Sequence, residues 1–238
     1  MPRQVPGVVP GGVVVAAFCP QPPLLVPELA VGAAPELADL RAACDEAVRR
    51  LLAAGPQRLY VLGAGRQPAR YLNGGLGTTA GLGVDIPLRL GSPVPDAADE
   101  LPLPLGLGGW LLERAGAQLP VVGVLAGPGG ELPPLELAGP AGLLVMGDGS
   151  ARREGRSPGY PDPQAVPYDE AVTVALTTGD PAALRALDVA LGARLLAAGA
   201  PAWRAAGELL AGGRYDAEVL YAEAPYGVGY LVAGWRRQ

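Results

Sequence analysis

The sequence has no histidine, and it has no lysine either, because all 18 basic residues are arginines. Without histidine the chain cannot form a Ser-His-Asp triad, a Cys-His pair, an H-E-x-x-H zinc site or a histidine-carboxylate iron site. Without lysine it cannot form a Walker A loop, a pyridoxal phosphate Schiff base or a Ser-Lys dyad. The usual catalytic groupings of many hydrolases, nucleotide-hydrolysing enzymes and metalloenzymes are therefore excluded.

Serine and cysteine are also scarce, so few side chains remain that could act as nucleophiles. The serines are Ser92, Ser150 and Ser157, and the thiols are Cys19 and Cys44. In a chain of this length, two cysteines favour the interpretation that both are small, buried apolar residues of a protein in a reducing compartment. A nucleophilic Cys19 is the alternative, although the sequence supplies no base that would generate its thiolate.

The formal charge of −5 and the scattered arginines give no long basic face, which argues against a nucleic-acid partner. Residues 12–18 are the longest apolar run near the N-terminus, and they fall far short of the roughly 20 residues that a membrane span needs. No cleavage site of small residues follows this run. We therefore expect a cytoplasmic protein that acts on or binds a small molecule, not a membrane or a nucleic acid.

Apolar runs alternate with amphipathic segments along the chain. The apolar runs predict buried strands, and apolar residues at helical spacing between Pro, Gly or Asp predict helices. The expected strands are residues 12–18, 58–62, 121–126, 142–146, 217–222 and 229–235, and the expected helices are residues 35–54, 168–178, 181–189 and 201–210. This alternation predicts an α/β fold with a central, largely parallel sheet flanked by helices. We expect residues 1–238 to form a single domain.

Glycine and proline mark the expected connections. Residues 66–83 predict a glycine-rich loop, residues 92–105 a surface connection, and residues 225–227 a hairpin or tight crossover between the last two strands. Two glycine clusters, residues 63–65 and residues 75–80, partly match a dinucleotide-binding fingerprint, but neither is convincing. After the first cluster, Pro68 stands where the fingerprint needs a small residue. The second cluster follows no clear strand and precedes no clear helix.

Four segments, in this order along the chain, resemble landmarks of the class III extradiol ring-cleavage dioxygenases. The resemblance is strongest to their LigB-like branch, which includes the Memo-type proteins. Residues 19–28 (CPQPPLLVPE) are similar to P-H-P-P-I-I-V-P-E, residues 60–65 (YVLGAG) to V-V-I-S-P-H, residues 146–152 (MGDGSAR) to S-G-D-x-S-H-R, and residues 220–230 (LYAEAPYGVGY) to S-Y-E-x-P-F-G-V-G-Y. Weaker matches to the family's downstream motifs P-G-Y, F-D and G-D occur at residues 158–160, 168–169 and 179–180.

The resemblance implies the family's fold, and it also implies that the family's iron site has been lost. Gln21 and Gly65 stand at the positions of the two iron-binding histidines, and Ala151 stands at the histidine that acts as acid and base. Glu223 matches the carboxylate ligand and is the one member of the site that is retained. Fe²⁺ therefore belongs to the ancestral family alone, and we expect no catechol cleavage and no cofactor here.

The candidate catalytic residues are Glu223 and Asp148, and the candidate pocket residues are Gln21, Gly65, Ser150, Ala151, Arg152 and Tyr226. Each carboxylate also has a structural interpretation. Glu223 could be a strand-end carboxylate held by an arginine or by backbone amides, and Asp148 could be a turn or N-cap residue. Arg152 and Arg153 could form a solvated surface pair, and Tyr226 could pack against the sheet.

Two interpretations follow from these residues. In the first, the chain is a non-catalytic or regulatory descendant of the family that binds a small molecule or a partner in the inherited pocket. In the second, it is an enzyme with changed chemistry, which uses Glu223 and Asp148 either for metal-free acid-base work or to hold Mg²⁺ or Mn²⁺. Two carboxylates that converge within about 5 Å would favour the second. The sequence leaves a homodimer or a complex with a partner chain open.

Overall fold

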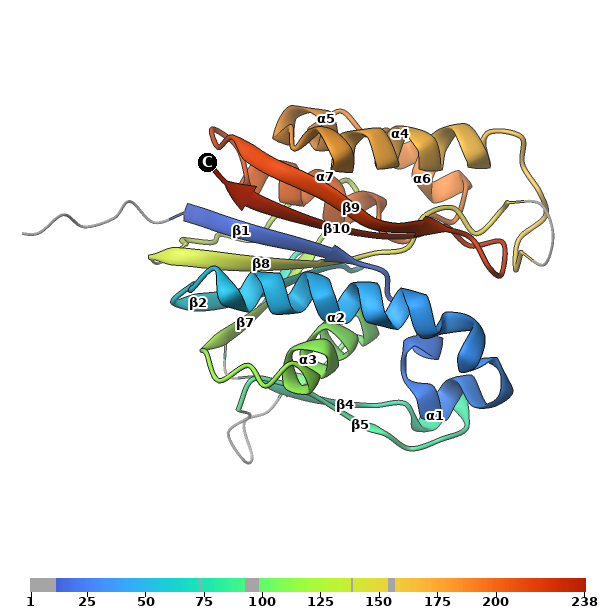
Figure 1. Ribbon diagram of the computed structural model, residues 1–238, viewed down its shortest axis with the longest axis horizontal. Coiled ribbons are helices and arrows are strands. Elements are labelled where there is room, and N and C mark those ends of the chain that lie inside the picture. The colour runs from blue at the N-terminus through green and yellow to red at the C-terminus, as the bar shows by residue number, and fades with distance from the viewer. Residues whose placement is uncertain (1–11, 73, 93–98, 138, 154–156) are drawn as a thin grey trace, which may run out of the picture.

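The structure is a computed structural model, and it describes residues 12–72, 74–92, 99–137, 139–153 and 157–238. A seven-stranded sheet lies at its centre, with the strand order β3-β7-β2-β8-β1-β10-β9 (Figure 1). The strands are β1 Gly12–Cys19, β2 Arg58–Ala64, β3 Ala69–Tyr71, β7 Val121–Ala126, β8 Pro140–Met146, β9 Tyr215–Glu223 and β10 Tyr230–Arg237. Neighbouring strands β7, β2, β8 and β1 are parallel, whereas β3, β10 and β9 each run antiparallel to the neighbour nearer the centre.

Helices cover both faces of this sheet, so the predicted α/β fold with a mostly parallel central sheet is confirmed. The helices are α1 Pro27–Ala30, α2 Ala38–Ala53, α3 Leu103–Arg114, α4 Ala165–Thr178, α5 Pro181–Arg185, α6 Val189–Arg194 and α7 Ala200–Leu209. Short 3₁₀ turns occupy Pro23–Leu25, Val31–Ala33, Pro35–Leu37 and Ala80–Leu82. In Figure 1, α2 and α3 lie on one side of the sheet and α4 to α7 lie on the other. No helix in the described part of the chain is long and apolar enough to cross a membrane.

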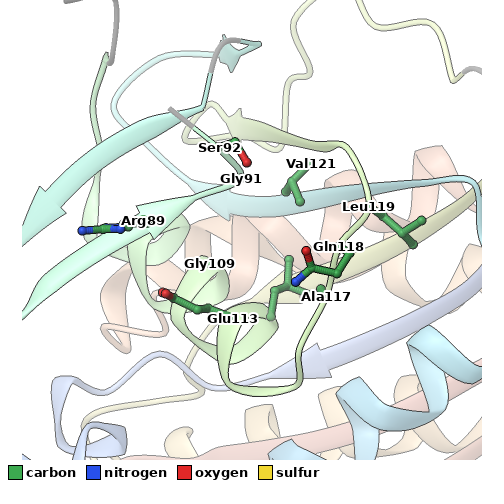
Figure 2. A pocket seen from close by; sticks show the side chains of 10 residues that line it. Arg89, Gly91, Ser92, Gly109, Glu113, Ala117, Gln118, Leu119 and Val121 are labelled. Carbon is green, nitrogen blue, oxygen red and sulfur yellow. The ribbon is translucent and has the colours of Figure 1, made fainter. Parts of the chain in front are cut away.

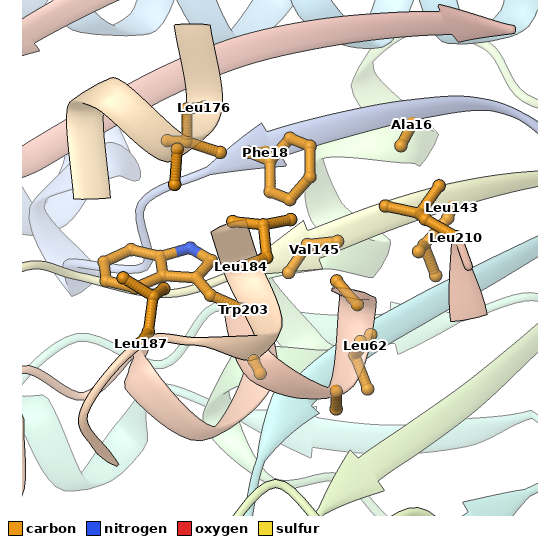
Figure 3. Packing of buried hydrophobic residues seen from close by; sticks show 14 of the residues in the cluster. Ala16, Phe18, Leu62, Leu143, Val145, Leu176, Leu184, Leu187, Trp203 and Leu210 are labelled. Carbon is orange, nitrogen blue, oxygen red and sulfur yellow. The ribbon is translucent and has the colours of Figure 1, made fainter. Parts of the chain in front are cut away.

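Alternate residues of the central strands point into two separate cores. Ala16 and Phe18 of β1 face α4 to α7, where Trp203 is buried among leucines (Figure 3). Ala17 and Cys19 of the same strand face α2 and α3. A strand that is buried on both faces needs apolar residues at every position. This requirement explains why the continuous apolar runs of the sequence identified the strands.

The glycine-rich stretch that was predicted to be a loop instead contains strands. It contributes β3 to the main sheet and β4, Gly75–Thr78, to a second sheet with order β5-β4-β6, where β5 is Pro87–Leu90 and β6 is Asp99–Glu100. At Gly77 a Cβ would lie only 3.2 Å from the Leu101 carbonyl oxygen, so a residue without a side chain lets the two backbones approach this closely. The close packing of backbone therefore explains why this strand is rich in glycine, a residue that usually argues against a strand.

The predicted surface connection at residues 92–105 was wrong at its C-terminal end. Residues 93–98 lie outside the described part of the chain, but β6 follows them and α3 begins at Leu103, with Leu105 fully buried. Helix α3 contains three glycines, which lower helix propensity and hide the helical pattern. Gly109 is required by packing, because a Cβ there would lie 1.9 Å from the Arg89 carbonyl oxygen of β5.

The helix predicted at residues 181–189 is shorter than expected, and the helix that follows it was not predicted. Helix α5 ends at Arg185, and α6 begins at Val189 after Asp188, whose carboxylate accepts the Leu191 N–H at 2.9 Å as an N-cap. The other three predicted helices agree with α2, α4 and α7 to within a few residues. The expected hairpin is confirmed, because β9 and β10 pair antiparallel at the edge of the sheet.

Candidate functional site

Three parallel strands bring the first candidate residues to one edge of the sheet. β1 and β8 end together, because Cys19 pairs with Met146, and β2 pairs with β8 up to Leu62. The loops that leave these strands carry Gln21, Gly65 and Asp148. Carboxyl ends of strands in open α/β sheets are common ligand sites, and the topology therefore supports a shared location for these candidates.

Gln21 and Asp148 join two of these loops. The Gln21 backbone N–H donates to Asp148 Oδ1 at 2.7 Å, while the Asp148 carbonyl accepts the Gly199 N–H at 2.8 Å. The side-chain oxygen Gln21 Oε1 is buried, and it has no hydrogen-bond partner within the described chain. Asp148 therefore ties the loop after β1 to the loop after β8, as a residue in a turn can. The side chain of Gln21 adds a buried acceptor without a partner in the same loop.

Burial raises the pKa of Asp148 to about 7, and the hydrogen bond from the Gln21 N–H opposes this shift. Asp148 is partly exposed as a residue, but its carboxyl group is surrounded by protein. Tyr230 lies nearby, and its pKa is raised by burial and, to a smaller extent, by the charge of Asp148. Asp148 therefore changes protonation near neutral pH, as an acid-base group or a pH-sensitive ligand contact would.

Glu223 is the last residue of β9, where it pairs with Tyr230 of β10. Its side chain is exposed and accepts a hydrogen bond from Tyr221 Oη at 3.3 Å. Burial, followed by the charge of Glu223, raises the pKa of Tyr221 to about 12. The shift in the pKa of Asp148 comes from burial and from the Gln21 N–H, and Glu223 is not among its causes.

The donors present at this edge do not fit a ferrous ion of the kind that the extradiol dioxygenases hold. Gly65 has no side chain, and a Cβ there would lie 2.8 Å from Leu125 Cδ1 and 3.2 Å from Leu125 Cβ. The space for a second ligand is therefore occupied by an apolar side chain. Across the described ranges, no three side chains of Asp, Glu or Cys come close enough together to hold a metal ion.

The loop after β8 is held by hydrogen bonds that its backbone groups and the Ser150 side chain make. Ser150 is fully buried, and its Oγ donates to the Leu195 carbonyl at 3.0 Å and accepts the Arg152 N–H at 3.1 Å. The Ala151 N–H donates to the same Leu195 carbonyl at 3.0 Å. These contacts make Ser150 and Ala151 part of the loop's framework. Arg152 is partly buried, so it is not a fully solvated surface residue, and its Nε has no partner in the part of the chain described.

Asp169 on α4 organises the same loop. It is 3 % exposed, its Oδ1 accepts the Ser150 N–H at 2.8 Å, and its Oδ2 lies 3.5 Å from Arg153 Nη1. Burial raises the pKa of Asp169 to about 6, although the Ser150 N–H and Arg153 oppose the shift. A Cβ at Gly229 would lie 2.3 Å from Asp169 Oδ2, so this glycine lets the hairpin approach the carboxylate.

The role of Asp169 was missed in the sequence. The Tyr168-Asp169 pair within a predicted helix could have indicated this role, because a carboxylate on the buried face of a helix needs hydrogen-bond donors from another segment. Tyr226 behaves differently from a pocket residue, since its hydroxyl donates to Glu36 Oε2 at 3.0 Å and its ring packs against the core beneath α2. The packing interpretation of Tyr226 is therefore supported.

Cys19 and Cys44 are free and buried, as expected for structural thiols. A hydrogen bond between them and burial raise the pKa of Cys44 well above its usual value. A thiol in this state is a poor nucleophile. The two cysteines are therefore part of the packing between β1 and α2.

A separate hollow of about 460 Å³ lies at the other end of the sheet, where β7 begins (Figure 2). It is formed by the last turns of α3, the end of β5 and the residues before β7. Ser92, Glu113 and Gln118 are among the polar residues that line it. It contains none of the candidate residues from the sequence.

Comparisons with known proteins give little further information. No protein-family model matches the chain, and no curated protein matches it. Among solved structures, the uncharacterized protein JW3007 from Escherichia coli K12 is similar over 93 % of this chain and 99 % of its own, with 14 % sequence identity and a TM-score of 0.46. The chain is thus similar to this bacterial protein at a level that carries no conclusion about fold family or activity.

Proposed function

We propose that the chain is a non-catalytic relative of the class III extradiol dioxygenases, with their LigB-like fold, and that it binds a small molecule at the carboxyl edge of the sheet. The observation that carries this proposal is the buried, unpartnered side-chain oxygen of Gln21, a residue whose backbone N–H donates to the carboxyl of Asp148. Buried polar atoms without partners are rare, and a ligand that donates a hydrogen bond would satisfy this one. We also infer a cytoplasmic location.

Loss of ring cleavage follows from the donor set. Ferrous iron in such a site needs imidazole nitrogen ligands and open positions, whereas this edge offers an amide oxygen, a carboxylate and a glycine packed against Leu125. Ala151 provides no proton acceptor in place of the acid-base histidine. The inherited arrangement therefore supports binding better than oxygen chemistry.

The polarity of the edge favours a ligand that donates hydrogen bonds. Gln21 Oε1 and the Asp148 carboxylate are both acceptors, and the Asp148 Oδ1 atom already takes the Gln21 N–H. An anionic ligand would be repelled by Asp148 when that residue is charged. A neutral molecule with adjacent hydroxyl groups would satisfy both side chains.

An enzyme with metal-free acid-base chemistry is the second candidate. It is favoured by the pKa of Asp148, which lies at about 7 and so matches the range of a general base or acid at neutral pH. In this case Asp148 would act without Glu223, which is exposed and is not among the causes of the shift in the pKa of Asp148. A hard-cation site gains no support from the described residues, because the carboxylates do not cluster.

The test compares catechol, which has two hydroxyl donors, with 1,2-dimethoxybenzene, which has none. Binding is followed by ligand-detected NMR titration with wild-type protein, Gln21→Met and the control Gln118→Met, which changes an exposed glutamine elsewhere. We expect catechol to bind more tightly than its dimethyl ether, and Gln21→Met to weaken catechol roughly two- to tenfold while Gln118→Met leaves it unchanged. Equal affinities for both compounds, or for both variants, would contradict the proposal.

Catalysis is tested on the same protein. Metal content is measured after purification without added metal, and oxygen uptake with protocatechuate is measured after anaerobic loading with Fe²⁺. We expect no uptake in wild-type protein or in Glu223→Ala. Uptake that is present in the wild type and absent in Glu223→Ala would overturn the non-catalytic assignment. Turnover of another substrate without oxygen that is lost in Asp148→Asn would favour the second candidate.

A further inference from the structure

A hollow of about 470 Å³ lies on the outer helical layer, between α4 and the segment that connects α5 to α6. Its volume falls within the usual range for small-molecule sites, roughly 300–1,000 Å³. Its apolar lining consists of Pro163, Pro167, Ala171, Ala186, Leu187 and Leu191. None of the residues at the carboxyl edge of the sheet lines this hollow, which is therefore distinct from the site proposed above.

Tyr168 is the polar residue that distinguishes this hollow from an ordinary apolar depression. It lines the hollow from α4, is 4 % exposed, and its hydroxyl is buried without a hydrogen-bond partner among the described residues. The ring reaches across to α6, because a Cβ at Gly192 would lie 2.6 Å from the Tyr168 hydroxyl oxygen. Buried tyrosine hydroxyls usually have a partner, so this donor lacks one that a ligand could supply.

The charges around Tyr168 restrict the kind of acceptor that would fit. Burial, and then the charges of Asp169 and Asp188, raise the pKa of Tyr168, so its hydroxyl remains a neutral donor. Asp188 also lines the hollow, and one of its oxygens accepts the Leu191 N–H at 2.9 Å. These carboxylates disfavour an anionic acceptor. Arg194 keeps its positive charge while it donates to Gln164 Oε1 at 2.9 Å, but the charges that act on the Tyr168 hydroxyl are those of the two carboxylates.

We propose that this hollow binds a small, largely apolar molecule carrying one neutral acceptor oxygen, such as a ketone, which accepts a hydrogen bond from the Tyr168 hydroxyl. The apolar body of the molecule lies against the proline and leucine side chains, whose burial supplies most of the affinity. The hydrogen bond sets its orientation. This site does not depend on the binding proposed at the sheet edge.

The test uses two probes that differ in the acceptor. 4-Fluoroacetophenone has a carbonyl oxygen, and 1-ethyl-4-fluorobenzene has the same ring without one. Each is titrated by fluorine NMR against wild-type protein and Tyr168→Phe, which removes the hydroxyl and keeps the ring. We expect Tyr168→Phe to weaken the ketone roughly two- to tenfold and to leave the hydrocarbon unchanged. Unchanged binding of the hydrocarbon also shows that the variant has kept the hollow intact.

A second pair of variants locates the probes. Ala171→Trp places a large side chain in the hollow from an exposed position of α4, and Val174→Trp places the same side chain on that helix outside the lining, at a residue that is 62 % exposed. We expect Ala171→Trp to abolish binding of both probes and Val174→Trp to leave it unchanged. Failure of the ketone to bind, equal ketone affinity in wild type and Tyr168→Phe, or unchanged binding in Ala171→Trp would each overturn the proposal.

Discussion

The Gln21 backbone N–H lies 2.7 Å from Asp148 Oδ1, although the two residues follow different strands and are far apart in the sequence. The bond fixes the loop after β1 against the loop after β8, and it leaves the Gln21 side-chain oxygen buried without a partner in the described chain. It also supplies the one favourable contact that opposes the effect of burial on the pKa of Asp148. The support of the two loops and the ligand contact that we propose therefore depend on the same carboxyl group.

Stability is expected to depend on pH through Asp148. Burial raises its pKa from 3.8 to about 7, so the folded protein holds a proton that the unfolded chain releases. The contribution of Asp148 to the free energy of unfolding should therefore be complete below about pH 4 and should be lost as the pH rises to about 7. Between these values the free energy of unfolding should fall by up to about 1.4 kcal/mol per pH unit. Urea unfolding of wild-type protein and Asp148→Asn between these values measures the slope. Identical slopes in the two proteins would refute this prediction.

Asp169 is expected to contribute to stability through the loop that it holds. Asp169→Ala leaves the Ser150 N–H without its acceptor, and should lower the free energy of unfolding by about 1–3 kcal/mol. Hydrogen exchange at the Ser150 amide should become faster in the same variant. Glu170→Ala, at the exposed neighbouring position of α4, is the control and should change stability by less than about 0.5 kcal/mol. Similar losses in both variants would show that Asp169 does not have this role.

Gly65 and Leu125 should be energetically coupled. Gly65→Ala alone should cost about 1–3 kcal/mol, because its Cβ would lie 2.8 Å from Leu125 Cδ1. In the background of Leu125→Ala, which creates space, the same change should cost much less. A double-mutant cycle by urea unfolding gives the coupling. Additive effects would mean that the glycine is not required by Leu125.

Gly109 should not tolerate alanine, although alanine is normally the better helix residue. The added Cβ would lie 1.9 Å from the Arg89 carbonyl oxygen, so α3 and β5 would have to separate, at a cost of about 1–3 kcal/mol. Gly81→Ala is the matched control, since a Cβ there meets nothing within 4 Å. Thermal unfolding of the two variants should differ clearly, and equal melting temperatures would contradict the packing explanation.

The parts of the fold that could be predicted were those with a local pattern. The strand that ends at Cys19 is a continuous apolar run because both of its faces are buried, and a run of this kind is visible in the sequence. Helix α3 and strand β4 were missed because their glycines serve contacts with distant segments, as Gly109 does with Arg89. Propensity scales count such glycines against regular structure.

The candidate site was predictable to a similar extent. The ends of three strands indicated where Gln21 and Asp148 would meet, because parallel strands present their carboxyl ends together. The hydrogen bond from Ser150 to Asp169 could not be predicted, since it joins a loop to a helix without any regular spacing between them. The unpartnered oxygen of Gln21 likewise depends on how the whole edge packs.

Strand order also has a consequence for how this chain acquires its structure during synthesis. β1 is the first of the described strands to leave the ribosome, yet its neighbours in the sheet are β8 and β10, and Phe18 pairs with Ala233. The N-terminal strand must therefore wait for almost the entire chain before its two edges are covered. Contacts so distant in sequence slow folding, and in the meantime the backbone N–H and C=O groups of β1 are unpaired and its apolar side chains are exposed. Nascent chains that stop before β10 should consequently recruit chaperones or aggregate, while chains that include the final hairpin reach the folded state.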